Sequence, residues 1–195
     1  MNFIEYSPLA LRTLKPFPHD QQVQHALLGM VTEAGELADA IKKHVIYGKP
    51  LDKVNVMEEI ADLMWYLNVF MVERSVGSRL VDDIWGVAVV SSEQDSLNDP
   101  WVLVEVALAA SQLVSALSIL DEKTRGARDK ETLAALVGIL SILLLHAGYT
   151  LSDALTTNIN KLAKRYGDKY TDYAALNRDT DSERLVLENF NGKVN

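Results

Sequence analysis

The 195-residue chain contains no cysteine and only five prolines, which limits its chemistry and favours long helices. Without cysteine it can form neither a disulfide framework nor a thiolate zinc site. Met1–Asp20 has no charged and apolar segments of the secretory type, so we expect a cytoplasmic protein. Basic residues are also few: 19 Lys and Arg against 27 Asp and Glu give a net charge of −8, which argues against general nucleic-acid binding.

Strand-forming patterns are scarce, and Val87–Val90 is the best of them. Apolar residues recur mostly at helical spacing, so the sequence predicts an all-α fold. Thr132–Ser152 has no Asp, Glu, Lys or Arg and is long enough to span a bilayer. Because His146 and Gly148 interrupt this stretch, a buried core helix is the better interpretation, and we expect no membrane association.

Proline, glycine and polar clusters divide the chain into predicted helices after a lead-in that Pro16 and Pro18 end. The helices are expected at about Asp20–Val45, Leu51–Glu73, Leu80–Trp85, Trp101–Leu120, Lys130–Ala147 and Thr150–Gly167. Thr150 and Asp153 have capping-box spacing. We expect one all-α domain (1–195) with a helical half (20–85), a linker (86–100), a second half with the closing helix (101–167), and a polar tail (168–195) that wraps the surface.

Two acidic pairs, Glu33 with Glu36 and Glu59 with Asp62, carry most of the functional information. The members of each pair are three positions apart and so share one helix face. Two such helices side by side would direct four carboxylates into one cleft, which suits a hard divalent cation such as Mg²⁺ or Mn²⁺. Asp62 lies in an apolar run and needs a cation nearby. Asp62→Asn is therefore expected to stabilise the metal-free protein.

An internal repeat relates two helical hairpins at one constant offset. The identical pairs are Leu27 and Leu103, Ala34 and Ala110, Leu37 and Leu113, Ala40 and Ala116, and Leu67 and Leu143. The four acids align with Ala109, Gln112, Ala135 and Gly138, so the second half can pack like the first but cannot hold a metal cluster. The sequence predicts a degenerate duplication, a tandem hairpin pseudo-dimer, in which Gly138 marks a close helix contact.

Taken together, the acidic motifs and their separation resemble the signature of the MazG-like all-α nucleoside triphosphate pyrophosphohydrolases, especially short phage and bacterial members. The similar blocks are Glu33–His44, Glu58–Tyr66, Asn158–Tyr166 and Asn177–Asp179. The resemblance covers about Asn2–Arg74 and Leu136–Glu188. The intervening stretch is a departure from single-unit members that the duplication explains, and dimeric dUTPases are relatives thought to contain fused units.

The resemblance implies Mg²⁺-dependent hydrolysis of a canonical or modified (deoxy)nucleoside triphosphate to the monophosphate and pyrophosphate, for nucleotide-pool control or house-cleaning. Glu33, Glu36, Glu59 and Asp62 would be the catalytic metal ligands, with one glutamate as general base. Glu58 is a rival to Glu59 because it lies four residues before Asp62. The second hairpin of each chain should take the place of a hairpin from a partner chain. By analogy with family tetramers, we expect a homodimer of such chains, with a monomer as the second choice.

Eight further residues are candidates for binding the nucleotide, and each has an ordinary structural alternative. They are Gln22, His25, Lys43, Trp65, Asn158, Lys161, Arg165 and Tyr166. Gln22 and His25 continue the acidic stripe and could read the base edge, and Trp65 or Tyr66 could stack on the base. Lys43, near the end of the first hairpin helix, could contact the triphosphate. Asn158, Lys161 and Arg165 share one face of the closing helix and could do the same.

Three other functions fit parts of the pattern. A phosphoribosyl-ATP pyrophosphohydrolase uses similar acidic helices, and a helical interaction module would have no catalysis. A ferritin-like di-iron protein normally needs Glu-x-x-His pairs. None of the four histidines follows a glutamate by three residues, which counts against the di-iron class.

Overall fold

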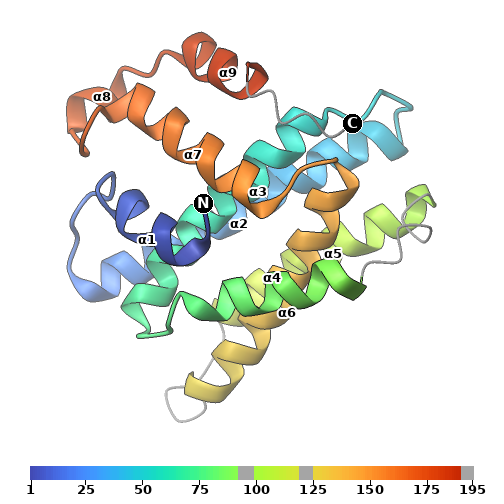
Figure 1. Cartoon of the computed structure of the whole chain (residues 1–195), viewed down its shortest axis with the longest axis horizontal. Helices are drawn as coiled ribbons and strands as arrows, with labels where there is room; N and C mark the ends of the chain where they lie inside the picture. The colour runs from blue at the N-terminus through green and yellow to red at the C-terminus, as the bar shows by residue number, and fades with distance from the viewer. Residues whose placement is uncertain (92–98, 119–124, 190–195) are drawn as a thin grey trace.

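In this computed structural model the chain forms helices around a shared apolar core (Figure 1). The structure describes residues 1–91, 99–118 and 125–189, and these contain nine helices and no strand. The helices are α1 (Phe3–Leu11), α2 (His19–Val45), α3 (Lys53–Glu73), α4 (Arg79–Ser91), α5 (Pro100–Ser118), α6 (Arg125–His146), α7 (Leu151–Tyr166), α8 (Asp172–Leu176) and α9 (Thr180–Glu188). The prediction of an all-α fold is confirmed.

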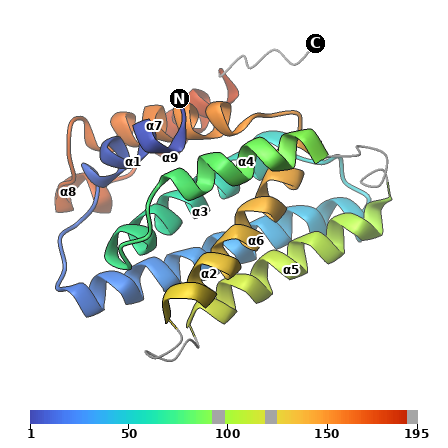
Figure 2. The same cartoon turned by 60° about the horizontal axis from the view of Figure 1, so that its bottom comes forward.

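The long helices α2 and α3 form the most extensive helix contact in the described part of the chain. Figure 2 shows α2 and α5 side by side along one side, with α1 and the C-terminal helices α7 to α9 along the opposite side. α3 lies between these layers and packs against both α2 and α7. Its stretch Ile60–Phe70 supplies much of the buried core. A side chain on the α2-facing or α7-facing side of α3 can therefore meet groups from widely separated parts of the sequence.

Capping groups fix the starts of α3 and α7, which pack against each other. The Asp52 carboxylate accepts the backbone N–H of Asn55 at 3.0 Å and so begins α3. Thr150 and Asp153 form the predicted capping box at the start of α7. Gly167 ends α7 with a φ of 65°, a conformation that a side chain would disfavour.

Several predicted boundaries were wrong because tertiary packing outweighed local composition. The N-terminal lead-in contains α1. Val87–Val90, the best strand candidate, lies within α4, and so do the first residues of the predicted linker, whose residues 92–98 lie outside the described residues. α6 begins at Arg125 rather than Lys130. The polar tail contains α8 and α9, and α9 docks on α7 with Leu187 buried.

The helices of the two halves pack reciprocally. α2 packs against α5 and α3 packs against α6, whereas α4 lies on α6 and α7 lies on α3. Exchanging α2, α3 and α4 with α5, α6 and α7 therefore maps this set of contacts onto itself, as a two-fold interface would. The expected close contact at Gly138 is wrong, because a Cβ placed there would meet no atom within 4 Å.

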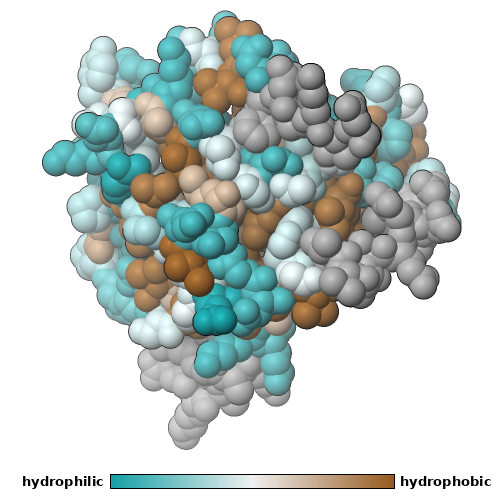
Figure 3. All heavy atoms as spheres, viewed as in Figure 1, coloured by the Kyte–Doolittle hydropathy of each residue, from teal (hydrophilic) through white to brown (hydrophobic). Residues whose placement is uncertain are grey.

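Among the described helices α5 has an apolar window, Pro100–Leu117, that could cross a membrane by length and composition alone. α5 packs along α2 and α6 and buries Leu103, Ala110 and Val114, and 28% of this window is buried within the structure. The apolar stretch Thr132–Ser152 is divided between α6 and α7, which meet at a bend of 90°. On the face seen in Figure 3, hydrophobic residues form separate groups among hydrophilic ones. That pattern is ordinary for a surface exposed to water.

Candidate functional site

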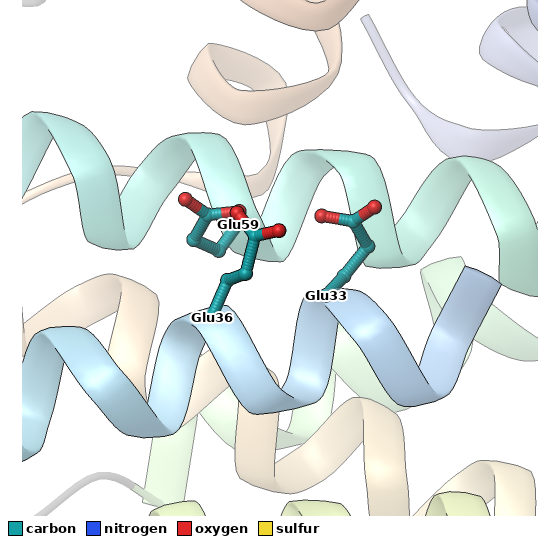
Figure 4. Close-up of side chains that lie close together, drawn as sticks. All are labelled: Glu33, Glu36 and Glu59. Atoms are coloured by element: carbon teal, nitrogen blue, oxygen red, sulfur yellow. The ribbon is translucent and has the colours of Figure 1, made fainter. Parts of the chain in front are cut away.

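Three of the four predicted metal ligands meet between α2 and α3. Glu33 and Glu36 extend from α2 toward α3, and Glu59 joins them from α3 (Figure 4). One carboxylate oxygen from each lies within 4.8 Å of the others. Glu59 is only 6% exposed, whereas Glu36 is open to solvent. This spacing would let one cation, with some of its waters, contact all three carboxylates.

The charged forms of these acids are costly without a cation. Burial, with repulsion from Asp62 and Glu36, raises the pKa of Glu33 to about 7. Burial, with repulsion from Glu36 and Glu33, raises the pKa of Glu59 to about 9. A divalent cation would relieve both effects by neutralising the carboxylates. The all-oxygen donor set fits a hard ion such as Mg²⁺.

Asp62, the fourth predicted ligand, is bonded to a cation that the chain itself supplies. Its carboxylate accepts the Lys161 ammonium from α7 and the side-chain amide of Asn158 at 2.7 Å. Lys161 is only 1% exposed and also donates to Glu58 at 3.2 Å. The cation that the apolar surroundings of Asp62 require is therefore present in the fold.

A buried chain of hydrogen bonds supports the contact between Asp62 and α7. The Tyr6 hydroxyl, from α1, donates to the Asn158 side-chain oxygen at 2.8 Å, which leaves the Asn158 amide hydrogens to donate to Asp62. Burial raises the pKa of Tyr6, so it remains a neutral donor. Burial alone would lower the pKa of Lys161, but the Asp62 and Glu58 carboxylates outweigh it and raise that pKa. Lys161 is therefore a permanent cation.

The acids line a cleft of about 580 Å³ with two other kinds of wall. One is aromatic and the other is cationic. The aromatic wall contains Phe17, His25, Trp65, Tyr66, Tyr166 and Tyr170. The cationic residues are Lys15, Arg165 and Arg178. Carboxylates for a metal, cations for phosphate and rings for a base thus surround one space whose volume is ordinary for a small-molecule site.

His25 lies at the centre of the aromatic wall. Its ring is 5.6 Å from Phe17, 5.5 Å from Tyr66 and 6.1 Å from Trp65, each in an edge-to-face arrangement. Burial lowers the pKa of His25, which keeps its imidazole neutral near pH 7. The Trp65 indole N–H donates to the Thr13 hydroxyl at 3.2 Å, which fixes that ring. A neutral, polar ring edge among fixed aromatic faces is suited to a heteroaromatic base.

Gly29 makes the close approach of α2 and the aromatic wall possible. A Cβ at this position would lie 2.2 Å from the Tyr66 ring. Gly29 has no side chain and so leaves room on this face of α2. The structure places the ring of Tyr66, from α3, in that room.

Four of the predicted nucleotide contacts do not line the cleft. Gln22 is 2% exposed, and its side-chain oxygen accepts the backbone N–H of Phe17 at 3.0 Å, so it orders the aromatic wall instead. Lys43 is exposed and pairs with Asp39 at 2.7 Å. Asn158 and Lys161 lie behind Asp62. His25, Trp65, Arg165 and Tyr166 do line the cleft, and Glu33, Glu36, Glu59 and Asp62 do as well.

Sequence reasoning missed several lining residues. Lys15, Phe17 and Tyr170 lie outside the regular helices, where periodicity gives no signal. Arg178 lies in the Asn177–Asp179 block that resembles the family tail, so that block was the only clue to it. Glu58, the rival to Glu59, also lines the cleft and is bonded to Lys161.

The chain matches no family of known proteins, no curated protein and no solved structure in the comparisons.

Proposed function

We propose that the protein is a Mg²⁺-dependent pyrophosphohydrolase that converts a nucleoside or deoxynucleoside triphosphate to the monophosphate and pyrophosphate. The observation that supports this most is the meeting of Glu33, Glu36 and Glu59 at one cleft with arginines and aromatic rings. The carboxylates suit a metal ion, the arginines suit phosphate groups and the rings suit a base, which are the parts of a metal-bound nucleoside triphosphate. The resemblance of the acidic motifs to the MazG-like enzymes points to the same reaction.

Different residues of the cleft would bind the metal ion, the phosphate groups and the base. The three glutamates would hold Mg²⁺, which when bound polarises the phosphoryl group and lowers the pKa of a coordinated water. Arg165 and Arg178 would donate hydrogen bonds to the phosphate oxygens. The aromatic wall around His25 would receive the base. The Lys161 ammonium would hold the Asp62 carboxylate in place.

We also propose that the two halves arose by duplication and that only the first retained the acids. The reciprocal packing of the helix triplets supports this proposal. The positions that correspond to the acids in the second half are Ala109, Gln112, Ala135 and Gly138. A homodimer of such chains remains our prediction, and light scattering of the full chain tests it.

The reaction is tested by measuring pyrophosphate and orthophosphate separately across a panel of nucleoside and deoxynucleoside triphosphates and phosphoribosyl-ATP, with Mg²⁺. The proposal expects pyrophosphate release that Glu36→Gln removes. Turnover of phosphoribosyl-ATP alone would support the related pyrophosphohydrolase instead. Release of orthophosphate without pyrophosphate, or of neither, would contradict the proposal. The absence of both products would favour a helical interaction module.

A further inference from the structure

We propose that Glu183 of α9 is a positioning residue that holds Arg165 and Arg178 as a pair of donors for the substrate's phosphate groups. The inference deepens the proposed function and rests on it for the identity of the substrate. Glu183 lies in the part of the chain where the sequence predicts a polar surface tail. It is nevertheless among the most buried charged residues described, at 3% exposed.

The contacts of Glu183 account for this burial. Arg165 Nε donates to Oε1 of Glu183 at 2.8 Å, and Arg165 Nη2 donates to Oε2, which makes the pair bidentate. Arg178 Nη2 donates to the same Oε2 at 2.8 Å. One carboxylate therefore fixes two guanidinium groups that come from α7 and from the turn before α9.

Both arginines line the cleft and keep donors to spare. A guanidinium carries five N–H groups, and these ion pairs use only some of them. Burial alone would raise the pKa of Glu183, but Arg165 and Arg178 hold it to about 2, so the carboxylate stays charged at working pH. Two guanidinium charges and one carboxylate leave a net positive charge at this wall, which suits an anion.

The acids of the same cleft explain why such a clamp is needed. Glu58 and Asp62 line the same cleft as the arginines. A flexible arginine in an empty cleft would be drawn to these carboxylates and would close the space that a triphosphate needs. By bonding to Arg165 and Arg178, Glu183 keeps both guanidinium groups from pairing with the acids of the cleft. α9 thus supports the two arginines of the site, although its own residues are not among those that line the cleft.

Inorganic tripolyphosphate is the appropriate probe, because it carries the phosphate chain without a base. Isothermal titration calorimetry of the full chain with Mg²⁺ should show that Glu183→Gln weakens tripolyphosphate binding by about tenfold. Glu183→Asp should also weaken it, because the shorter side chain cannot reach both arginines. Asp181→Asn is the matched control: it removes one charge from the exposed face of the same helix and should leave the affinity unchanged.

A double-mutant cycle separates positioning from structural support. If Glu183 acts through its two arginines, then Glu183→Gln should cost little further affinity in a background that carries both Arg165→Gln and Arg178→Gln. In the hydrolysis assay the single Glu183 variant should raise KM more than it lowers kcat. Additive losses in the cycle, or wild-type affinity in a folded Glu183→Gln protein, would overturn the inference.

The clamp can be tested even if Glu183→Gln does not fold, and its failure can be distinguished from failure of the proposed reaction. Should circular dichroism show that Glu183→Gln does not fold, Arg178→Gln replaces it, since that side chain is 46% exposed; unchanged affinity there would overturn the clamp. Wild-type protein that binds tripolyphosphate in a Glu183-dependent way but hydrolyses no nucleotide would support the clamp and contradict the proposed reaction. Wild-type protein that does not bind tripolyphosphate would contradict the clamp.

Discussion

The Lys161 ammonium is bonded to the Asp62 carboxylate inside the bundle and ties α7 to α3. The lysine is almost wholly buried, while Asp62 still reaches the cleft. Because Glu58 also accepts from Lys161, one positive charge is shared by two carboxylates at the edge of the acidic site. The pair therefore reduces the repulsion among the acids before any metal binds.

This arrangement reverses the expectation that Asp62→Asn stabilises the metal-free protein. The substitution leaves a buried ammonium whose one remaining charged partner, within the described part of the chain, is Glu58. We predict that it lowers the free energy of unfolding by about 1–3 kcal/mol, in addition to removing turnover. Urea denaturation in a metal chelator measures the effect. Asp39→Asn, which removes the exposed ion pairs with Lys42 and Lys43 on α2, is the control and should leave the stability nearly unchanged.

Glu36→Gln should affect catalysis without affecting the fold. Glu36 is exposed on α2 and contributes one of the three clustered oxygens. We expect hydrolysis to fall by more than about 100-fold while the unfolding midpoint stays near that of the wild type. Gln112→Ala, at the equivalent position of the second half, is the control and should keep its rate within a few fold. Near-normal Mg²⁺-dependent turnover of Glu36→Gln would remove this residue from the site.

The stability of the metal-free protein should fall as the pH rises. The pKa of Glu33 is raised to about 7 and that of Glu59 to about 9, from a normal value of 4.5. Between pH 4.5 and about pH 9 the folded protein therefore binds more protons than the unfolded chain. Their contribution is complete below 4.5 and is lost as the pH passes through the folded values. Thermal unfolding between about pH 5 and pH 9 tests this. Glu59→Gln should flatten the slope, and an unchanged slope would contradict the assignment.

The fit between Gly29 and Tyr66 gives a prediction about packing. Gly29→Ala would place a methyl carbon in the Tyr66 ring, and we expect a loss of about 1–3 kcal/mol together with weaker nucleotide binding. Gly35→Ala on the same helix meets no atom within 4 Å and should instead stabilise the protein by about 0.5–1 kcal/mol. Denaturation and nucleotide titration of both variants compare the two sites. Equal stability changes would show that the ring moves away freely.

Local sequence was enough for the all-α class and for the meeting of three acids. Glu33 and Glu36 share a face by helical period alone, and Glu59 follows once α2 and α3 pair as a hairpin. The need of Asp62 for a cation was also predictable from its apolar neighbours. Its partner Lys161 was not, because that contact depends on how α7 crosses α3.

Tertiary packing likewise decided the features that the sequence did not reveal. α9 looked like a polar tail because its charges were counted as solvated, whereas Glu183 is buried between arginines. Tyr6 belongs to a helix that the lead-in was not expected to contain. Gly138 lies on an apolar helix, where composition suggested a close contact, but the packing of the neighbouring helices leaves the space beside it unfilled.

The last prediction is that each chain carries one catalytic site despite its two hairpins. In the described residues one cluster of possible metal ligands is present, and it belongs to α2 and α3. The second half offers Ala109, Gln112, Ala135 and Gly138 at the corresponding positions, and these neutral groups cannot offset the charge of Mg²⁺. Calorimetric titration with a non-hydrolysable nucleoside triphosphate analogue and Mg²⁺ should therefore give one equivalent per chain.

The variants distinguish one site from two weak ones. Glu36→Gln should remove nearly all of the Mg²⁺-dependent analogue binding, because the second half holds no substitute for the lost ligand. Gln112→Glu would restore one carboxylate to the second half, yet a single acid without partners from α6 should not create a second equivalent. A stoichiometry of two equal sites in the wild type would show that the second half is not degenerate. The same conclusion would follow if the Glu36→Gln variant retained half of the wild-type binding stoichiometry.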